Sequence, residues 1–118
     1  RSANRRLAAN PNYARQVLSP LEYSAGQTNP AIARMQYGNA VERMVGQQIR
    51  ENPITSHLFQ HVGGPGNPDF IGRSLFNGLI FDITTNTSRS ISAHLLRPYG
   101  HNLILITYSR PGNFGVFP

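Results

Sequence analysis

The spacing of apolar side chains changes near residue 58 of the chain. Before residue 52 the spacing is typical of helices, whereas β-branched and aromatic residues dominate after residue 58. An asparagine cap followed by proline predicts two helices, one over 11–18 and a longer one that begins near Asn29-Pro30 and ends at Asn52-Pro53. We expect the Ser19-Pro20 pair to end the first of them.

The second part of the chain reads as a small sheet with one helix. The stretch 63–68 is rich in glycine and proline and predicts a turn or loop, and the spacing of 88–97 predicts a helix. The predicted strands cover 58–62, 69–72, 79–84 and 103–108, followed by an irregular tail. The order of helix, three strands, helix and strand predicts an α/β or α+β layout with a small mixed sheet.

Composition adds a strong positive charge to this picture. The 118 residues include eleven arginines, no lysine and only five acids, giving a formal net charge of +6. That balance points to an acidic partner, and a distributed arginine surface suits a nucleic acid held along its backbone. The chain has no cysteine, which excludes a disulfide framework and a thiol nucleophile. No apolar run is long enough to cross a membrane, and a start at arginine predicts a piece of a longer protein.

Three of the five acids lie where a cation site can form. Asp69 follows the glycine-rich turn, Asp82 lies inside the apolar strand LIFDIT, and Glu42 lies near the apolar face of the long helix. A charge inside such a strand is costly unless it is paired or binds a metal. If the three carboxylates converge at a sheet edge, a divalent cation would relieve their repulsion, and oxygen ligands favour Mg²⁺ or Mn²⁺.

Each of these carboxylates also has a purely structural interpretation. Glu42 alone would be a solvated helix residue paired with Arg43 or Arg50, and Asp69 would be a turn or cap residue. Asp82 would accept hydrogen bonds from backbone amides or from an arginine. Together the three are better explained by a metal site.

Three short motifs resemble those of the PD-(D/E)xK nuclease superfamily. They are the run YGNAVE that ends at Glu42, the sequence Pro68-Asp69-Phe70, and the tripeptide Asp82-Ile83-Thr84. The resemblance implies a restriction-endonuclease-like αβββαβ core over 37–108 within one domain of residues 1–118. An extra N-terminal helical part would cover 1–36, and the tail would cover 109–118.

The resemblance implies metal-assisted hydrolysis of a phosphodiester bond. Glu42, Asp69 and Asp82 would hold Mg²⁺, or Mn²⁺ or Zn²⁺ in its place. The family's lysine position is occupied by Thr84, which would position the attacking water through its hydroxyl. The missing positive charge would then come from the metal, from Arg89 or Arg97, or from His94, whose alternative is to pack at the edge of its helix.

The motif FDITT with the serine-rich helix that follows is similar to C-terminal toxin domains of contact-dependent growth inhibition (CdiA-type) proteins. That similarity implies delivery from the cell surface as part of a larger protein, action in the target-cell cytoplasm, and tRNA as the favoured substrate. It also implies a cognate immunity protein, which the +6 charge predicts to be acidic. Arg73, Arg89 and Arg97 are the expected substrate-binding residues.

Other functions remain open on the residues alone. The same fold could cut DNA, or His94 or His101 could act in a metal-independent ribonuclease that uses the RNA 2′-hydroxyl as nucleophile. A non-catalytic nucleic-acid-binding module is the third alternative. Tyr99 and Tyr108 could stack on bases, although such residues more often belong to a core or its rim.

Overall fold

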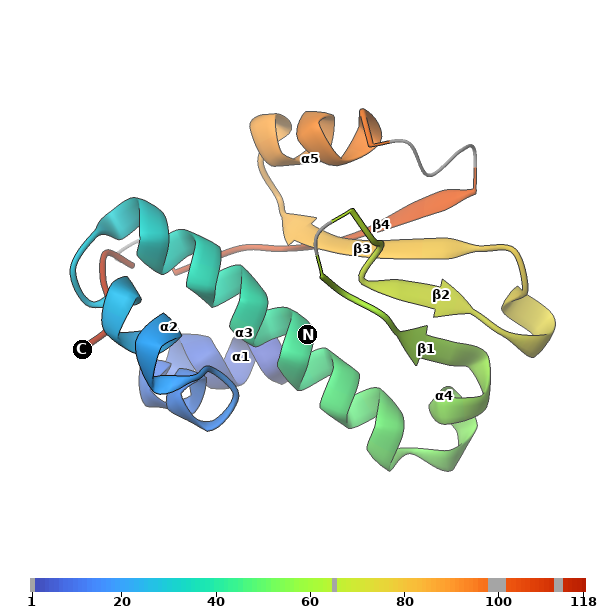
Figure 1. Cartoon of the computed structure of the whole chain (residues 1–118), viewed down its shortest axis with the longest axis horizontal. Coiled ribbons are helices and arrows are strands. Elements are labelled where there is room, and N and C mark those ends of the chain that lie inside the picture. Colours follow the sequence, from blue (N-terminus) through green and yellow to red (C-terminus); the bar gives the residue numbers. More distant parts are fainter. Residues whose placement is uncertain (1, 65, 98–101, 112–113) are drawn as a thin grey trace. The chain divides into compact units, whose positions relative to one another are not determined.

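In the computed structural model the chain forms two compact units, one of residues 1–45 and 109–118 and the other of residues 46–108. The structure describes residues 2–64, 66–97, 102–111 and 114–118. The first unit is helical, and the second holds a small β-sheet (Figure 1). The boundary between them falls within one long helix, after Val45. The single domain expected from the sequence stays a prediction.

Four helical elements begin the chain. They are α1 (Ser2–Ala9), the 3₁₀ helix η1 (Pro11–Gln16), α2 (Pro20–Gly26) and α3 (Pro30–Glu51). The long helix is confirmed, and the side chain of Asn29 caps it by accepting from the amide of Ala31 at 2.8 Å.

The helix expected over 11–18 is confirmed in part, with Asn10 as its cap, but it does not open the chain and the Ser19-Pro20 pair does not end it. That segment is a 3₁₀ helix that ends at Gln16, and an α-helix lies on each side of it. The Ser19-Pro20 pair begins a helix, because Ser19 accepts from the amide of Glu22 while the Glu22 carboxylate accepts from the amide of Ser19. This reciprocal capping box, with proline at the first helical position, favours a helix start.

The C-terminal residues pack into the first unit as part of its core. Phe117 is buried, stacks on Tyr23 with ring centroids 4.9 Å apart, and donates its amide to the carbonyl of Gly26. Phe114 meets Tyr37 edge to face at 4.9 Å. The predicted tail has no regular secondary structure in its described residues, and its aromatic side chains nevertheless complete this helical unit.

Two polar groups of the first unit have strongly shifted pKa values. Glu22 receives two hydrogen bonds from the Arg43 guanidinium, at 2.6 and 2.7 Å, and these lower its carboxyl pKa to about 2. Burial raises the pKa of Tyr37 to about 12, and its hydroxyl donates to Asn4 Oδ1 at 2.7 Å.

The second unit is built on a four-stranded mixed sheet. Its elements are α4 (Pro53–Leu58), β1 (Phe59–His61), β2 (Phe70–Gly72), η2 (Ser74–Phe76), β3 (Ile80–Thr85), α5 (Ser88–Leu95) and β4 (Leu103–Tyr108). The strand order is β1-β2-β3-β4; the first two pairs are antiparallel and β3 runs parallel to β4. The protein is therefore of the mixed α+β class, as the pattern predicted. The four strands and the last helix are confirmed to within one or two residues at each end.

Aromatic side chains fill one side of this sheet. Phe81 of β3 meets Phe59 of β1 edge to face at 5.1 Å and Phe76 of η2 at 6.4 Å. The parallel connection from β3 to β4 runs through α5, which packs beside both strands (Figure 1). No helix in the described part of the chain has both the length and the apolar character needed to cross a membrane.

Candidate active site

Asp82 lies in the middle of β3, and its side chain is 0% exposed to solvent. The carboxylate oxygen Oδ1 accepts a hydrogen bond from the backbone amide of Asp69 at 2.9 Å. Burying a carboxylate is costly unless donors replace its water. Here the donors are the backbone amide of Asp69, immediately before β2, and a guanidinium group described below.

The Asp69 side chain in turn accepts a hydrogen bond from the backbone of β3. Its Oδ2 accepts from the backbone amide of Ile83 at 2.6 Å. The β2–β3 ladder pairs Phe70 with Phe81, so Asp69 and Asp82 face each other one position beyond that pair. Asp82 thus accepts a hydrogen bond from the backbone of Asp69, and Asp69 accepts one from the backbone of β3. These side-chain bonds lie just beyond the end of the β2–β3 backbone ladder. We call Asp69 and Asp82 the carboxylate pair.

Arg97, two residues after the end of α5, places a positive charge beside Asp82. Arg97 Nη1 donates to Asp82 Oδ2 at 3.2 Å, and the Arg97 side chain is 41% exposed. The crossover helix between two parallel strands brings this arginine back to β3, which lies 15 residues earlier in the sequence. This arginine, which partly faces solvent, compensates the negative charge of the buried carboxylate.

Hydroxyl groups line the same strand beyond the carboxylate pair. Thr84 is 4% exposed and lies two positions after Asp82, so both side chains point to the same side of β3. Thr85 Oγ1 donates to Ser90 Oγ at 2.7 Å and ties the strand end to the first turns of α5. This hydrogen bond links the end of β3 to the crossover helix, whose N-terminal cap is Thr87.

His94 lies one turn after Ser90 on α5, as expected. Its ring atom Nδ1 lies 2.8 Å from the carbonyl oxygen of Ser90. A carbonyl only accepts, so Nδ1 carries the proton and Nε2 is left with a lone pair in the neutral ring. The neutral tautomer of His94 is therefore suited to accept a proton or bind a metal through Nε2.

The other predicted residues lie outside this group of contacts. Arg73 donates to the side-chain oxygen of Gln60, and Arg89 is exposed on α5. Glu42 belongs to the first unit, where it lies half-buried on α3 and its charge helps to raise the pKa of Arg43. Tyr99 and His101 lie outside the described residues.

Within the second unit the structure thus brings together Asp69, Asp82 and Arg97. In the described ranges no three histidine, aspartate or glutamate side chains gather closely enough to hold a metal ion together. Two carboxylates are nevertheless a donor set that Mg²⁺ uses in proteins, because this ion keeps several of its waters. The Asp82–Arg97 contact was one of several pairings that the sequence allowed, because arginines are spread along the whole chain.

Comparison with protein-family models, with curated proteins and with solved structures finds no match to this chain. The candidate site therefore rests on its own geometry and on the short motifs found in the sequence.

Proposed function

We propose that this protein is a metal-dependent nuclease that hydrolyses phosphodiester bonds in RNA, with tRNA favoured over DNA. The observation that carries the proposal is the carboxylate pair, in which a fully buried Asp82 and Asp69 face each other across β2 and β3. Burying the Asp82 carboxylate beside the half-buried Asp69 is energetically costly, and the two side chains supply the hard oxygen ligands that Mg²⁺ and Mn²⁺ prefer.

The donor chemistry of the pair fits a divalent cation. Each carboxylate oxygen has two lone pairs, so an oxygen that accepts one amide hydrogen bond can still bind a cation. Asp69 and Asp82 would hold the ion, and Glu42 is the third ligand that the superfamily resemblance implies. When bound, the metal would lower the pKa of a water and offset charge on the scissile phosphate. Zn²⁺ is a further candidate for the same ligands.

Arg97 supports the proposal because its positive charge would replace that of the lysine found in the superfamily motif. Its guanidinium lies 3.2 Å from Asp82, where it would move from that carboxylate to the scissile phosphate once a cation takes over the carboxylate charge. The hydroxyl of Thr84, on the same side of β3, would orient the attacking water. Arg73 and Arg89 would contact other phosphates of the substrate.

The order of elements in the second unit also supports the proposed restriction-endonuclease-like core. From α3 onward the strands and the crossover helix follow the order αβββαβ, with α4 and η2 as additions. Asp69 immediately precedes β2 and Asp82 lies inside β3, where the motifs of that superfamily would place them.

The proposal is tested by incubating the chain with total tRNA and with plasmid DNA, each with Mg²⁺ and with EDTA. We expect RNA cleavage that requires the metal and that falls at least about a hundredfold in Asp82→Asn and in Asp69→Asn. Glu51→Gln is the matched control, since it removes one negative charge from an exposed residue of the same unit. Full activity of both aspartate variants would refute the proposed site.

Cleavage in EDTA would instead indicate the metal-independent ribonuclease, with cyclic-phosphate ends on its products. His94 is the described residue to test for that chemistry, because its neutral tautomer leaves Nε2 free to accept a proton. In that case His94→Ala would abolish the cleavage and Asp82→Asn would leave it.

A second candidate function, a non-catalytic nucleic-acid-binding module, is favoured by a specific observation. Both oxygens of Asp82 have protein donors, and in the described part of the chain no buried polar side-chain atom lacks a hydrogen-bond partner. Such complete satisfaction also suits a purely structural aspartate. This candidate predicts saturable RNA binding with no cleavage at high protein and metal concentrations.

We further propose a toxin role for the domain. It would be delivered from the cell surface as part of a larger protein and act in the target-cell cytoplasm, and an acidic immunity protein would neutralise it. The +6 charge supports the acidic partner. The expected complex weakens with rising salt and shields Asp82, and a salt-insensitive complex that leaves Asp82 accessible would contradict this role.

A further inference from the structure

Positive charge is divided unequally between the two units. The first unit contains seven of the eleven arginines and two of the five acids, a formal charge of +5. The second unit, which holds the carboxylate pair, has the remaining four arginines and three acids, a formal charge of +1. The electrostatic attraction for a polyanion therefore comes mainly from the helical unit.

The described arginines of the first unit are largely available to a partner. Arg5, Arg6, Arg15 and Arg34 are exposed, whereas Arg43 is tied to Glu22 by two hydrogen bonds. Because Glu22 is neutralised within the unit, it does little to offset the exposed guanidinium groups.

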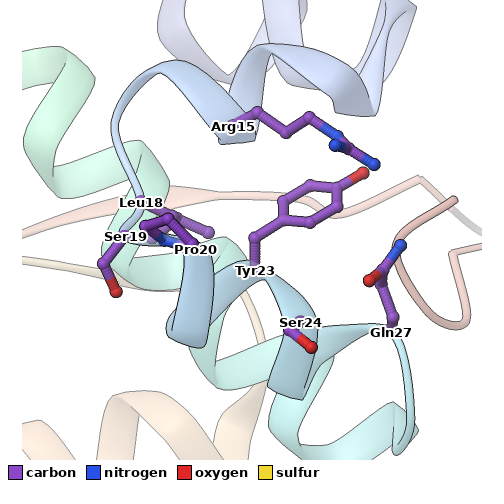
Figure 2. Close-up of a pocket in the computed structure, with 7 residues that line it drawn as sticks. All are labelled: Arg15, Leu18, Ser19, Pro20, Tyr23, Ser24 and Gln27. Carbon is purple, nitrogen blue, oxygen red and sulfur yellow. The ribbon is translucent and has the colours of Figure 1, made fainter.

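A pocket of about 310 Å³ opens beside one of these arginines. Figure 2 shows the Arg15 side chain reaching over the ring of Tyr23, with Gln27 at the far side of the pocket. The full lining is Arg15, Leu18, Ser19, Pro20, Tyr23, Ser24 and Gln27, which includes no acidic residue. The volume lies at the lower end of the range for small-ligand sites, which suits a single nucleotide.

Contacts within the first unit hold the Tyr23 side chain that forms one wall of the pocket. The Arg15 guanidinium carbon lies 4.3 Å from the Tyr23 ring centroid, and Phe117 stacks on the same ring with planes 7° apart. The Tyr23 hydroxyl also donates to the carbonyl of Pro118 at 2.9 Å. A cation held over a fixed ring loses little conformational freedom when it binds an anion.

We propose that the Arg15 pocket binds one nucleotide of the substrate strand, with a backbone phosphate on the Arg15 guanidinium. This subsite lies in the helical unit, whereas the carboxylate pair belongs to the sheet unit, so binding and cleavage would be separable. The inference rests on the proposed action on RNA. It favours RNA over an acidic protein because the exposed arginines are spread over α1, η1 and α3, as a repeating phosphate backbone requires.

The test is a binding measurement under conditions that prevent cleavage. A fluorescein-labelled, single-stranded 2′-O-methyl RNA is titrated with the full chain in EDTA at several salt concentrations, and anisotropy is followed. We expect Arg15→Gln to weaken binding about five- to tenfold and to lower the salt slope by about 0.7, the value for one phosphate contact on a single strand. Arg50→Gln, which removes the same charge from the second unit, should change affinity less than about twofold.

Two further variants separate charge from folding. Arg15→Lys keeps the positive charge and should retain most of the affinity, whereas Ser24→Asp adds a negative charge to the exposed pocket wall and should weaken binding. Nuclear magnetic resonance then locates the ligand: uridine monophosphate should shift the amide signals of residues 15–27, and uridine without phosphate should not. Circular dichroism checks that each variant is folded.

Several results would overturn the inference. Native affinity and salt slope in Arg15→Gln, or the same signal shifts with uridine as with uridine monophosphate, would show that the pocket takes no phosphate. Displacement of the RNA by polyglutamate at equal charge concentration would assign the pocket to acidic proteins. Because binding is measured without catalysis, loss of affinity in Arg15→Gln alongside full cleavage by Asp82→Asn would refute the proposed active site and leave this subsite standing.

Discussion

The Glu22–Arg43 ion pair makes the stability of the first unit depend on pH in a way that one substitution can isolate. Glu22→Gln removes the negative charge while a glutamine oxygen can still accept the Ser19 amide hydrogen bond of the capping box. The variant therefore loses the charge-assisted bonds to Arg43 and keeps the start of α2.

The pKa shift sets the size and direction of the effect. The carboxyl pKa of Glu22 falls from 4.5 to about 2 in the folded chain, so the unfolded chain binds the proton more tightly. The stabilisation is fully present above pH 4.5 and is lost as the pH falls toward 2. A shift of this size corresponds to about 3.4 kcal/mol. Because the side chains of Arg43 and Glu22 are 38% and 25% exposed, solvent screening reduces the expected contribution to about 1–2 kcal/mol.

Urea unfolding followed by circular dichroism measures this contribution. Urea is preferred because guanidinium chloride is a salt and screens the pair. At neutral pH we expect Glu22→Gln to be about 1–2 kcal/mol less stable than the native chain, and the difference should shrink steadily below pH 4.5. Asn29→Ala is the control, since it removes the cap of α3 and not a partner of Glu22, and it should lower stability by a similar amount at every pH. A difference between Glu22→Gln and the native chain that stays constant down to pH 2 would refute the assigned role of the ion pair.

Three further predictions concern a close approach, a buried phenol and a helix cap. Gly72→Ala should lower stability by about 1–3 kcal/mol in urea unfolding, because the new Cβ would overlap the backbone carbonyl of Phe76. Stability should fall as the pH rises from 10 toward 12, because the pKa of Tyr37 is raised to about 12 in the folded chain, and Tyr37→Phe should remove that part of the decline. Thr87→Ala should lower the stability of the second unit by about 1 kcal/mol, because Thr87 Oγ1 accepts from the amide of Ser90 at the start of α5.

Each of these predictions has a control. Gly115→Ala should be neutral, since a Cβ there meets no atom within 4 Å, and an equally small effect at Gly72 would contradict the overlap. An unchanged alkaline decline in Tyr37→Phe would show that another group causes it. Thr87→Ser keeps the cap hydroxyl, so equal losses in the serine and alanine variants would exclude the capping hydrogen bond.

The sheet unit was more predictable from sequence than the helical unit, and the reason lies in the kind of signal each gives. The strands of the sheet consist of β-prone runs such as 103–108, bounded by turn residues, and that pattern is local. In the first unit the helices before α3 are short, and their buried positions include small residues such as Ala3 and Ala14, which mark no clear face. Ser19-Pro20 could end one helix or begin the next, and the glutamate three residues after Ser19 is the local signal for a helix start, which the capping box in the structure confirms.

The candidate site was predictable in part. Asp82 can be identified from the sequence because a charged residue interrupts an apolar strand, and the structure confirms that it is buried. The register of β2 against β3 then brings Asp69 opposite Asp82. Arg97 was one of three candidate cations, since the choice among them depends on how α5 returns the chain to the sheet.

Composition and local periodicity need no information from distant residues. They were therefore enough to establish the net charge, the absence of lysine and cysteine, and the order of strands and helices in the sheet unit. The grouping of residues into the two units depends on contacts between distant parts of the chain and is visible in the fold alone. Residues 109–118 follow the last strand in sequence and pack with the first helices, because Phe114 and Phe117 bury their rings against Tyr37 and Tyr23. That long-range packing fixes Tyr23 beneath Arg15 and so forms the pocket from residues whose spacing in the sequence gives no sign of it.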